Sequence, residues 1–128
     1  MEIGIIGTQK VTVTEDKTAK AMGSGELNVF ATPAMIALME NTAYKSVAEY
    51  LEPGQGTVGT LMNVSHVAAT PMGMQIKCET KLVEIDRRRL VFEVKASDEK
   101  GLIGEGTHER FIVDNAKFMA RAEAKKEG

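Results

Sequence analysis

The sequence predicts an α+β domain in which an antiparallel sheet of about five strands covers one central helix. Three observations lead to this expectation. One long segment, residues 33–51, is apolar at three- and four-residue intervals, as in a helix buried against a sheet. Four later segments alternate apolar and polar residues and are separated by short turns, which join antiparallel neighbours. A short segment rich in β-branched residues, 9–14, precedes the helix and is expected to be a further strand.

The helix is expected to begin at about Pro33 and to end at about Leu51. Thr32 is a suitable N-cap, because its hydroxyl can accept a hydrogen bond from a free first-turn amide, and Pro33 has no amide that needs a partner. Pro53 and Gly54 end the helix, since proline cannot continue the hydrogen-bond ladder. The apolar stripe of the helix consists of Ile36, Met39, Ala43, Val47 and Tyr50. The polar residues 15–28 that precede the helix are expected to form a loop.

The four strands after the helix are expected at residues 57–67, 74–83, 90–97 and 102–113. Turns are expected at residues 86–88 and 98–101, and the tail that contains Phe118 is expected to be a short helix. Cys78, the single cysteine, lies among alternating apolar residues and is expected in the core. A sheet wrapped around one helix is the arrangement of the hotdog fold, and we expect one such domain over residues 1–128.

Composition excludes several classes of protein. Lysine and arginine number 16 against 18 aspartates and glutamates, a formal charge of −2, whereas a dedicated nucleic-acid-binding domain is usually basic. A single cysteine excludes a disulfide framework and a cysteine-rich zinc site. No apolar run approaches the roughly 20 residues that span a bilayer. The first seven residues do not resemble a secretion signal, so we expect a soluble cytoplasmic protein without a membrane partner.

Glu40 is unusual because its neighbours on the helix surface are apolar. At about 3.6 residues per turn, it lies in the band that contains Ile36, Ala43 and Val47. An unpaired carboxylate in an apolar band costs several kcal/mol, so one interpretation is a residue at the rim of the core whose side chain reaches solvent. The other interpretation is a carboxylate in a cleft, available as an acid, a base or a nucleophile.

The two histidines are candidates of unequal strength. His66 ends the strand whose inward-facing residues include Met62 and Val64, and it is either a structural residue or a proton-transfer group. His108 has less apolar neighbours, and we expect a structural or rim role for it. With two histidines and no pair of cysteines, no metal site is expected.

Residues 54–59 read Gly-Gln-Gly-Thr-Val-Gly and match the pattern of a dinucleotide-binding loop. That loop follows a strand and precedes a helix, whereas here the helix comes first, so we reject the dinucleotide interpretation. The glycines instead turn the chain from helix to strand, and Gly59 allows a close approach to the backbone. The three consecutive arginines 87–89 are expected in a solvated turn, where one or two of them could meet a nucleotide phosphate.

Residues 29–32, 38–40, 50–60, 65–71 and 104–110 carry a more specific signal. In combination they closely resemble the fluoroacetyl-CoA thioesterase family of hotdog proteins. The resemblance covers roughly residues 29–118, the larger part of the chain.

The resemblance implies an acyl-CoA thioesterase that acts as a homodimer and needs no cofactor apart from the coenzyme A of its substrate. It implies a catalytic set of Thr32, Glu40 and His66. It also implies that Gly59 contacts the substrate and that Arg110 lies near the active site, as substrate-binding residues.

This set suits the hydrolysis of a thioester, which needs an attacking oxygen, a group that moves the proton and donors for the developing oxyanion. Glu40 could attack the carbonyl or activate a water molecule, and the sequence leaves both routes open. Thr32 and Glu40 lie eight residues apart, about 12 Å along the helix at about 1.5 Å per residue. They cannot touch within one helix, so a partner subunit or the substrate must close the gap, which fits a site at a dimer interface.

Two features depart from the enzyme that gives the family its name. Residues 18–28 are short, polar and without an aromatic residue, where that enzyme has an aromatic lid, and Pro33 replaces a small flexible residue. We therefore expect a short or medium acyl group other than fluoroacetyl.

Two other functions remain as alternatives. One is a non-catalytic acyl-CoA binding module on the same scaffold. The other is a hotdog dehydratase or hydratase, which is disfavoured because residues 67–69 are Val-Ala-Ala where those enzymes have proline and glycine soon after the histidine.

Overall fold

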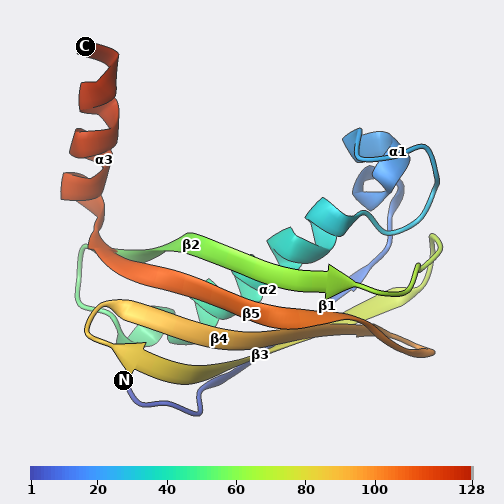
Figure 1. Ribbon diagram of the computed structural model, residues 1–128, viewed down its shortest axis with the longest axis horizontal. Coiled ribbons are helices and arrows are strands. Elements are labelled where there is room, and N and C mark those ends of the chain that lie inside the picture. Colours follow the sequence, from blue (N-terminus) through green and yellow to red (C-terminus); the bar gives the residue numbers. More distant parts are fainter. Residues whose placement is uncertain (128) are drawn as a thin grey trace.

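Five antiparallel strands form one sheet in the order β1-β3-β4-β5-β2, so that β1 and β2 are its edges (Figure 1). The computed structural model describes residues 1–127. The strands are β1 (Ile6–Thr12), β2 (Gln55–His66), β3 (Gln75–Asp86), β4 (Arg89–Asp98) and β5 (Gly101–Asp114). The expected α+β architecture, with one antiparallel sheet and one long helix, is confirmed.

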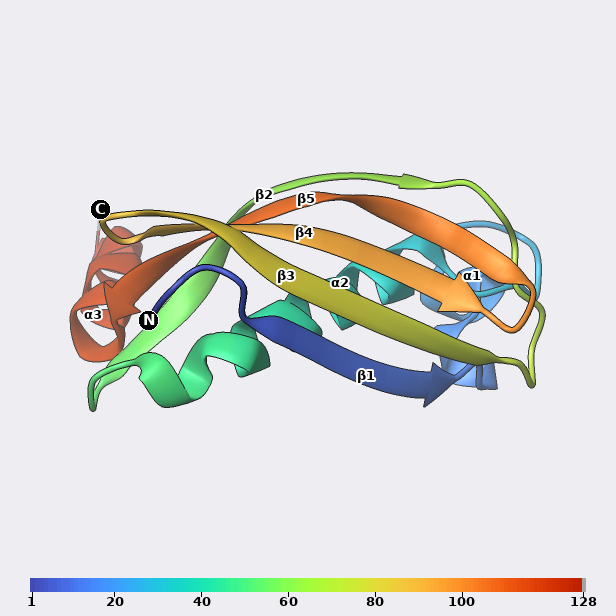
Figure 2. The same cartoon turned by 90° about the horizontal axis from the view of Figure 1, so that it is seen from below.

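The long helix, α2 (Thr32–Val47), lies across one face of the sheet, which curves around it (Figures 1 and 2). Every second residue over the middle of β3 and β4 is buried, as the alternating pattern predicted. Cys78 is fully buried among these side chains, and its place in the core is confirmed. The helix contributes Met35, Leu38, Met39, Ala43 and Val47 to the same core.

The helix differs from the expected segment at both ends. Ala31 is the residue before the first turn, Thr32 is already helical, and no side chain caps the amino end. At the other end the chain tightens after Val47 into a 3₁₀ turn, η2 (Ala48–Tyr50). This tighter turn moves Tyr50 away from the helical stripe to which it was assigned, and its side chain is 48% exposed.

The remaining segments add short elements at both ends of the chain. β1 begins at Ile6, three residues before the expected strand, and ends at Thr12. The segment expected as a plain loop contains a 3₁₀ turn, η1 (Glu15–Lys17), and one short helix, α1 (Ala19–Met22). The tail forms α3 (Asn115–Glu123) and then η3 (Ala124–Glu127). Over residues 1–127, no helix has both the length and the apolar character that a membrane crossing needs.

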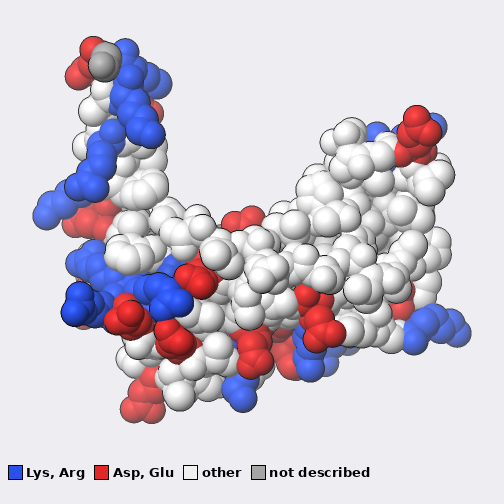
Figure 3. Space-filling view, in the orientation of Figure 1, with Lys and Arg blue, Asp and Glu red and all other residues white. Residues whose placement is uncertain are grey.

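Within residues 1–127, the outer edge of β2 pairs with no other strand. α3 on one side, and α1 with the first turns of α2 on the other, project beyond this edge and leave a wide notch between them (Figures 1 and 3). Figure 3 shows few charged side chains in the notch, whereas they are frequent around it. A strand of 12 residues with an unpaired edge presents a row of free backbone donors and acceptors, which favours pairing with another strand.

The core assignment can be tested by replacing one leucine of β3. Leu82 is 0% exposed, so we expect Leu82→Ala to lower the free energy of unfolding by about 2–5 kcal/mol, through lost burial and the cavity that remains. Leu27→Ala makes the same deletion at a residue that is 68% exposed, and it should change the free energy of unfolding by about 0.5 kcal/mol at most. Urea unfolding measures both values, and equal losses would contradict the place of Leu82 in the core.

Candidate active site

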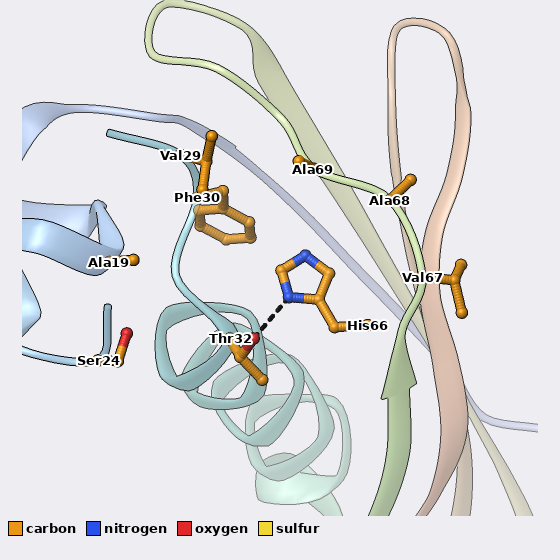
Figure 4. Close-up of a pocket in the computed structure, with 9 residues that line it drawn as sticks. All are labelled: Ala19, Ser24, Val29, Phe30, Thr32, His66, Val67, Ala68 and Ala69. Atoms are coloured by element: carbon orange, nitrogen blue, oxygen red, sulfur yellow. Dashed lines mark hydrogen bonds between the residues drawn. The ribbon is translucent and has the colours of Figure 1, made fainter. Parts of the chain in front are cut away.

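A threonine and a histidine from distant parts of the chain meet at the start of α2. The Thr32 Oγ1 and His66 Nδ1 atoms are 2.8 Å apart, a hydrogen-bond distance (Figure 4). Thr32 is the first residue of α2, and His66 is the last residue of β2. The hydroxyl that the sequence assigned to helix capping therefore bonds to the imidazole instead, and the capping prediction is wrong.

The imidazole of His66 keeps its second nitrogen free. Nε2 is buried and has no hydrogen-bond partner among residues 1–127. In Figure 4 this nitrogen points away from Thr32, and the ring of Phe30 stands edge-on to the imidazole with centroids 6.5 Å apart. Burial lowers the pKa of His66. An uncharged imidazole with one free nitrogen is suited to accept or return a proton.

A cavity of about 290 Å³ opens in front of this pair. Its walls come from the segment before α2, from α1 and from the chain that follows β2 (Figure 4). No charged side chain of residues 1–127 lines it. Besides Thr32 and His66, the lining residues are Ala19, Ser24, Val29, Phe30, Val67, Ala68 and Ala69.

Glu40 lies two turns further along α2, in a second group of side chains. Its Oε2 atom is 3.7 Å from Nη1 of Arg110, and its side chain is 45% exposed. The carboxylate passes over Gly59 of β2, where an added Cβ would come within 2.8 Å of Oε2. A side chain at position 59 would therefore displace the carboxylate, which explains the glycine. Glu40 is half-exposed, as the rim interpretation expects, but its carboxylate is paired with Arg110 and does not extend freely into solvent.

Arg110 is 6% exposed and is held by four hydrogen-bond or ionic contacts. Its Nε donates to Thr57 Oγ1 at 2.8 Å and its Nη2 donates to the Thr57 carbonyl at 2.9 Å. Its guanidinium also lies over the ring of Tyr44, 5.7 Å from the centroid. Burial lowers the pKa of Arg110, while the nearby Glu40 carboxylate favours the charged form. These contacts leave the guanidinium one orientation, with Nη1 towards Glu40.

His108 is the residue whose importance the sequence analysis missed. It is 1% exposed and both of its ring nitrogens have partners, so of the structural or rim role that was expected, the structural role holds and the rim position is wrong. The Leu61 carbonyl, which can only accept, lies 2.8 Å from Nδ1, and Arg110 Nη1, which can only donate, lies 3.1 Å from Nε2. These partners require a neutral imidazole with its proton on Nδ1, and burial lowers the pKa of His108 in agreement. The sequence held one signal for this contact: His108 and Arg110 are two residues apart on one strand, so their side chains lie on the same face of the sheet.

The predicted site residues thus form two separate groups within one chain. One group contains Thr32 and His66, and the other contains Glu40, Gly59 and Arg110. The eight-residue spacing of Thr32 and Glu40 corresponds to about 12 Å along α2, as expected.

Comparison with known proteins identifies the family. A family model described as fluoroacetyl-CoA-specific thioesterase matches residues 13–116. The chain belongs to the fluoroacetyl-CoA-specific thioesterase family. A fluoroacetyl-CoA thioesterase of Streptantibioticus cattleyicolor is 43% identical over 97 residues, which cover 76% of this chain and 70% of the relative.

Solved structures agree with this membership. A variant of the fluoroacetyl-CoA thioesterase in complex with acetyl-CoA superposes with a TM-score of 0.93 at 36% identity, over 98% of both chains. A thioesterase superfamily member from Thermus thermophilus gives a TM-score of 0.90 at 28% identity, over 98% of this chain and 93% of that one. The hotdog fold expected from the sequence is therefore confirmed, and the family is one of thioester hydrolases.

The neutral state of His108 predicts a pH-dependent stability. The unfolded chain would protonate this histidine near its ordinary pKa of 6.5, while the folded chain resists protonation because its pKa is lowered. The unfolding free energy should therefore fall as the pH decreases below 6.5, by up to about 1.4 kcal/mol per pH unit from this residue.

In His108→Gln this contribution should disappear, because glutamine can donate to Leu61 and accept from Arg110 without titrating. Urea unfolding of both proteins between pH 5 and pH 7.5 measures the difference. Parallel pH dependence in the two proteins would refute the neutral state of His108.

Proposed function

We propose that this protein hydrolyses the thioester of a short or medium acyl-CoA, with Thr32, Glu40 and His66 as its catalytic set. The observation that carries the proposal is the Thr32–His66 hydrogen bond at an uncharged cavity, with Nε2 of His66 buried and free. Membership of the thioesterase family and the resemblance to an acetyl-CoA complex support it.

The proposed reaction consumes water and needs no cofactor. A bond forms between a water oxygen and the acyl carbon, the carbon–sulfur bond breaks, and the sulfur leaves as the thiol of coenzyme A. Glu40 serves either as the nucleophile, in an acyl-enzyme that water then cleaves, or as the base that activates water. In both routes His66 moves the proton and Thr32 orients the imidazole. The amino end of α2, with its partial positive charge, opens on the same cavity and suits the developing oxyanion.

The other two residues of the second group, Gly59 and Arg110, have a different task in this proposal. Arg110 holds the Glu40 carboxylate in place, and Gly59 leaves room for that carboxylate and is proposed to let the substrate approach the strand. Both residues are therefore proposed to bind and position, without taking part in bond cleavage.

A homodimer completes the proposed site. Within one chain Glu40 is too far from Thr32 to act on the same carbonyl. The free edge of β2 and the weakly charged notch beside it fit the β2 edge of a second copy. Antiparallel pairing of the two β2 strands would bring His66 of one copy towards the Glu40 side of the other.

The acyl group follows from the walls of the cavity. Ala19 and Ser24 are the lining residues from the segment before residue 29, and neither is aromatic. The cavity of about 290 Å³ has space for a short or medium alkyl chain beside Phe30 and Val29. A cytoplasmic location stays a prediction from the sequence.

Replacement of the proposed catalytic groups tests the activity. We expect Glu40→Gln and His66→Ala to lower kcat for a short acyl-CoA by about 10²- to 10⁴-fold, because each removes a group that attacks or moves a proton. Glu49→Gln, which neutralises an exposed carboxylate just beyond the same helix, should leave the rate unchanged. Release of coenzyme A is followed with a thiol-detecting reagent over a series of acyl chain lengths. Calorimetric binding without turnover by the wild type would identify a binding module instead.

Mixing two inactive variants tests whether the site is shared. A dimer of one Glu40→Gln chain and one His66→Ala chain contains one intact site if each site takes Glu40 from one copy and His66 from the other. After subunit exchange, an equal mixture should recover about one quarter of the wild-type activity, since half of the dimers are mixed and each has one intact site. No recovery, with exchange verified by mass spectrometry, would show that each site lies within one chain.

A further inference from the structure

A basic cavity lies at the end of the molecule that carries α3. It has a volume of about 220 Å³ and is bordered by the turn between β3 and β4, the end of β5 and the first turns of α3. Three cationic side chains line it: Arg88, Lys117 and Arg121. Figure 3 shows blue side chains gathered at this end of the molecule and along α3.

These three cations remain available to an anion, although Arg88 Nη1 already donates to the Ile112 carbonyl at 3.4 Å. Within residues 1–127 none of them forms an ion pair, whereas the neighbouring Arg89 is held by Glu84 and Glu109. The one carboxylate at the cavity, Asp114, accepts the backbone amide of Lys117 at 3.1 Å and so caps α3. The cavity therefore carries a net charge of +2, from three cations and one carboxylate.

Two aromatic rings stand beside the cations. Phe111 and Phe118 line the same cavity, and they are 42% and 41% exposed. Exposed rings next to guanidinium groups form a surface on which a planar base can stack while its phosphates meet the cations. This combination has the chemistry to bind a phosphorylated nucleoside.

The other cavities do not offer this chemistry. Within residues 1–127 the cavity at Thr32 and His66 is lined by no cationic side chain, so it offers no charged side chain to the phosphates of a coenzyme A thioester. A cavity on the sheet places two lysines among three glutamates, and one beside β1 balances two lysines with two carboxylates. Among the cavities described, the one at α3 is the only one with a clear excess of positive charge.

We propose that Arg88, Lys117 and Arg121, with Phe118, bind the phosphorylated adenosine end of the coenzyme A thioester. This inference rests on the proposed function, which supplies a substrate with that group. The cations neutralise the phosphates, and the phenyl ring stacks against adenine.

The position along β2 connects this cavity with the shared site. Phe111 to Asp114 pair with Val58 to Gln55, at the start of β2, whereas His66 ends that strand. The two places are 8 to 11 residues apart along β2, about 26–36 Å within one chain at about 3.3 Å per residue. In an antiparallel β2 pair, however, the end of one strand meets the start of the other. The basic cavity of one copy would therefore bind the nucleotide end of the substrate whose thioester lies at His66 of the second copy.

Removal of two cations tests the assignment. We expect the double variant Arg88→Gln/Arg121→Gln to raise the KM for acyl-CoA about tenfold or more, because two charge-assisted hydrogen bonds are lost. Its kcat should stay unchanged, and so should its activity on the matching acyl-pantetheine, which lacks the nucleotide. The control Lys10→Gln/Lys100→Gln removes the same charge at exposed positions outside this cavity and should keep the wild-type KM.

Direct binding keeps this result separate from the proposed activity. Calorimetry with adenosine 3′,5′-bisphosphate, with ADP and with coenzyme A should show that the wild type binds each of them. The Arg88→Gln/Arg121→Gln variant should bind them with an affinity that is lower by about tenfold or more. These titrations remain informative if the wild type hydrolyses no thioester. An unchanged KM for acyl-CoA, or equal binding of coenzyme A by wild type and variant, would overturn the assignment. Binding of the free nucleotides without an effect on KM would also overturn it.

Discussion

The side chain of Arg110 carries a positive charge into the space between α2 and the sheet, where it is 6% exposed. A charge in such a place is costly unless every donor finds a partner. Thr57, His108 and Glu40 supply these partners, and the Leu61 carbonyl fixes His108 in turn. One chain of contacts thus links β2, β5 and α2. The position of the Glu40 carboxylate depends on it, because helix geometry alone would leave a half-exposed glutamate free to move.

Most of the fold follows from local patterns. Alternation in β3 and β4 identified which residues are buried, because a strand has only two faces and one of them meets the helix. The start of α2 could not be predicted fully. The Thr32 hydroxyl can bond to a local amide or to the imidazole of His66, and local sequence does not show that His66, 34 residues away, lies beside it. The two short helical segments at residues 15–17 and 19–22 were also missed, since turns this short have no clear periodicity.

In the candidate site, too, features that depend on neighbouring residues were predictable from the sequence, whereas contacts between distant residues were not. Glu40 and His66 were identified because each is out of place in an apolar stretch, and the family resemblance assigned their roles. His108 was undervalued, because its neighbours in sequence do not show that a carbonyl of β2 and a guanidinium of β5 saturate both of its nitrogens. The separation of Thr32 from Glu40 was predictable from the rise of the helix alone. A fold built on one straight helix cannot bring those two residues together without a second molecule.

The burial of Cys78 has a practical consequence for work on this protein. It is the single thiol in the sequence, it is 0% exposed, and burial raises its pKa, so it reacts slowly with alkylating reagents. A cysteine introduced on the surface would therefore be the preferred point of attachment for a spin label or a fluorophore. Labels placed on α3 or on the segment before α2 would report distances between the two copies of the proposed dimer, and their changes when a substrate enters, without prior removal of the native thiol.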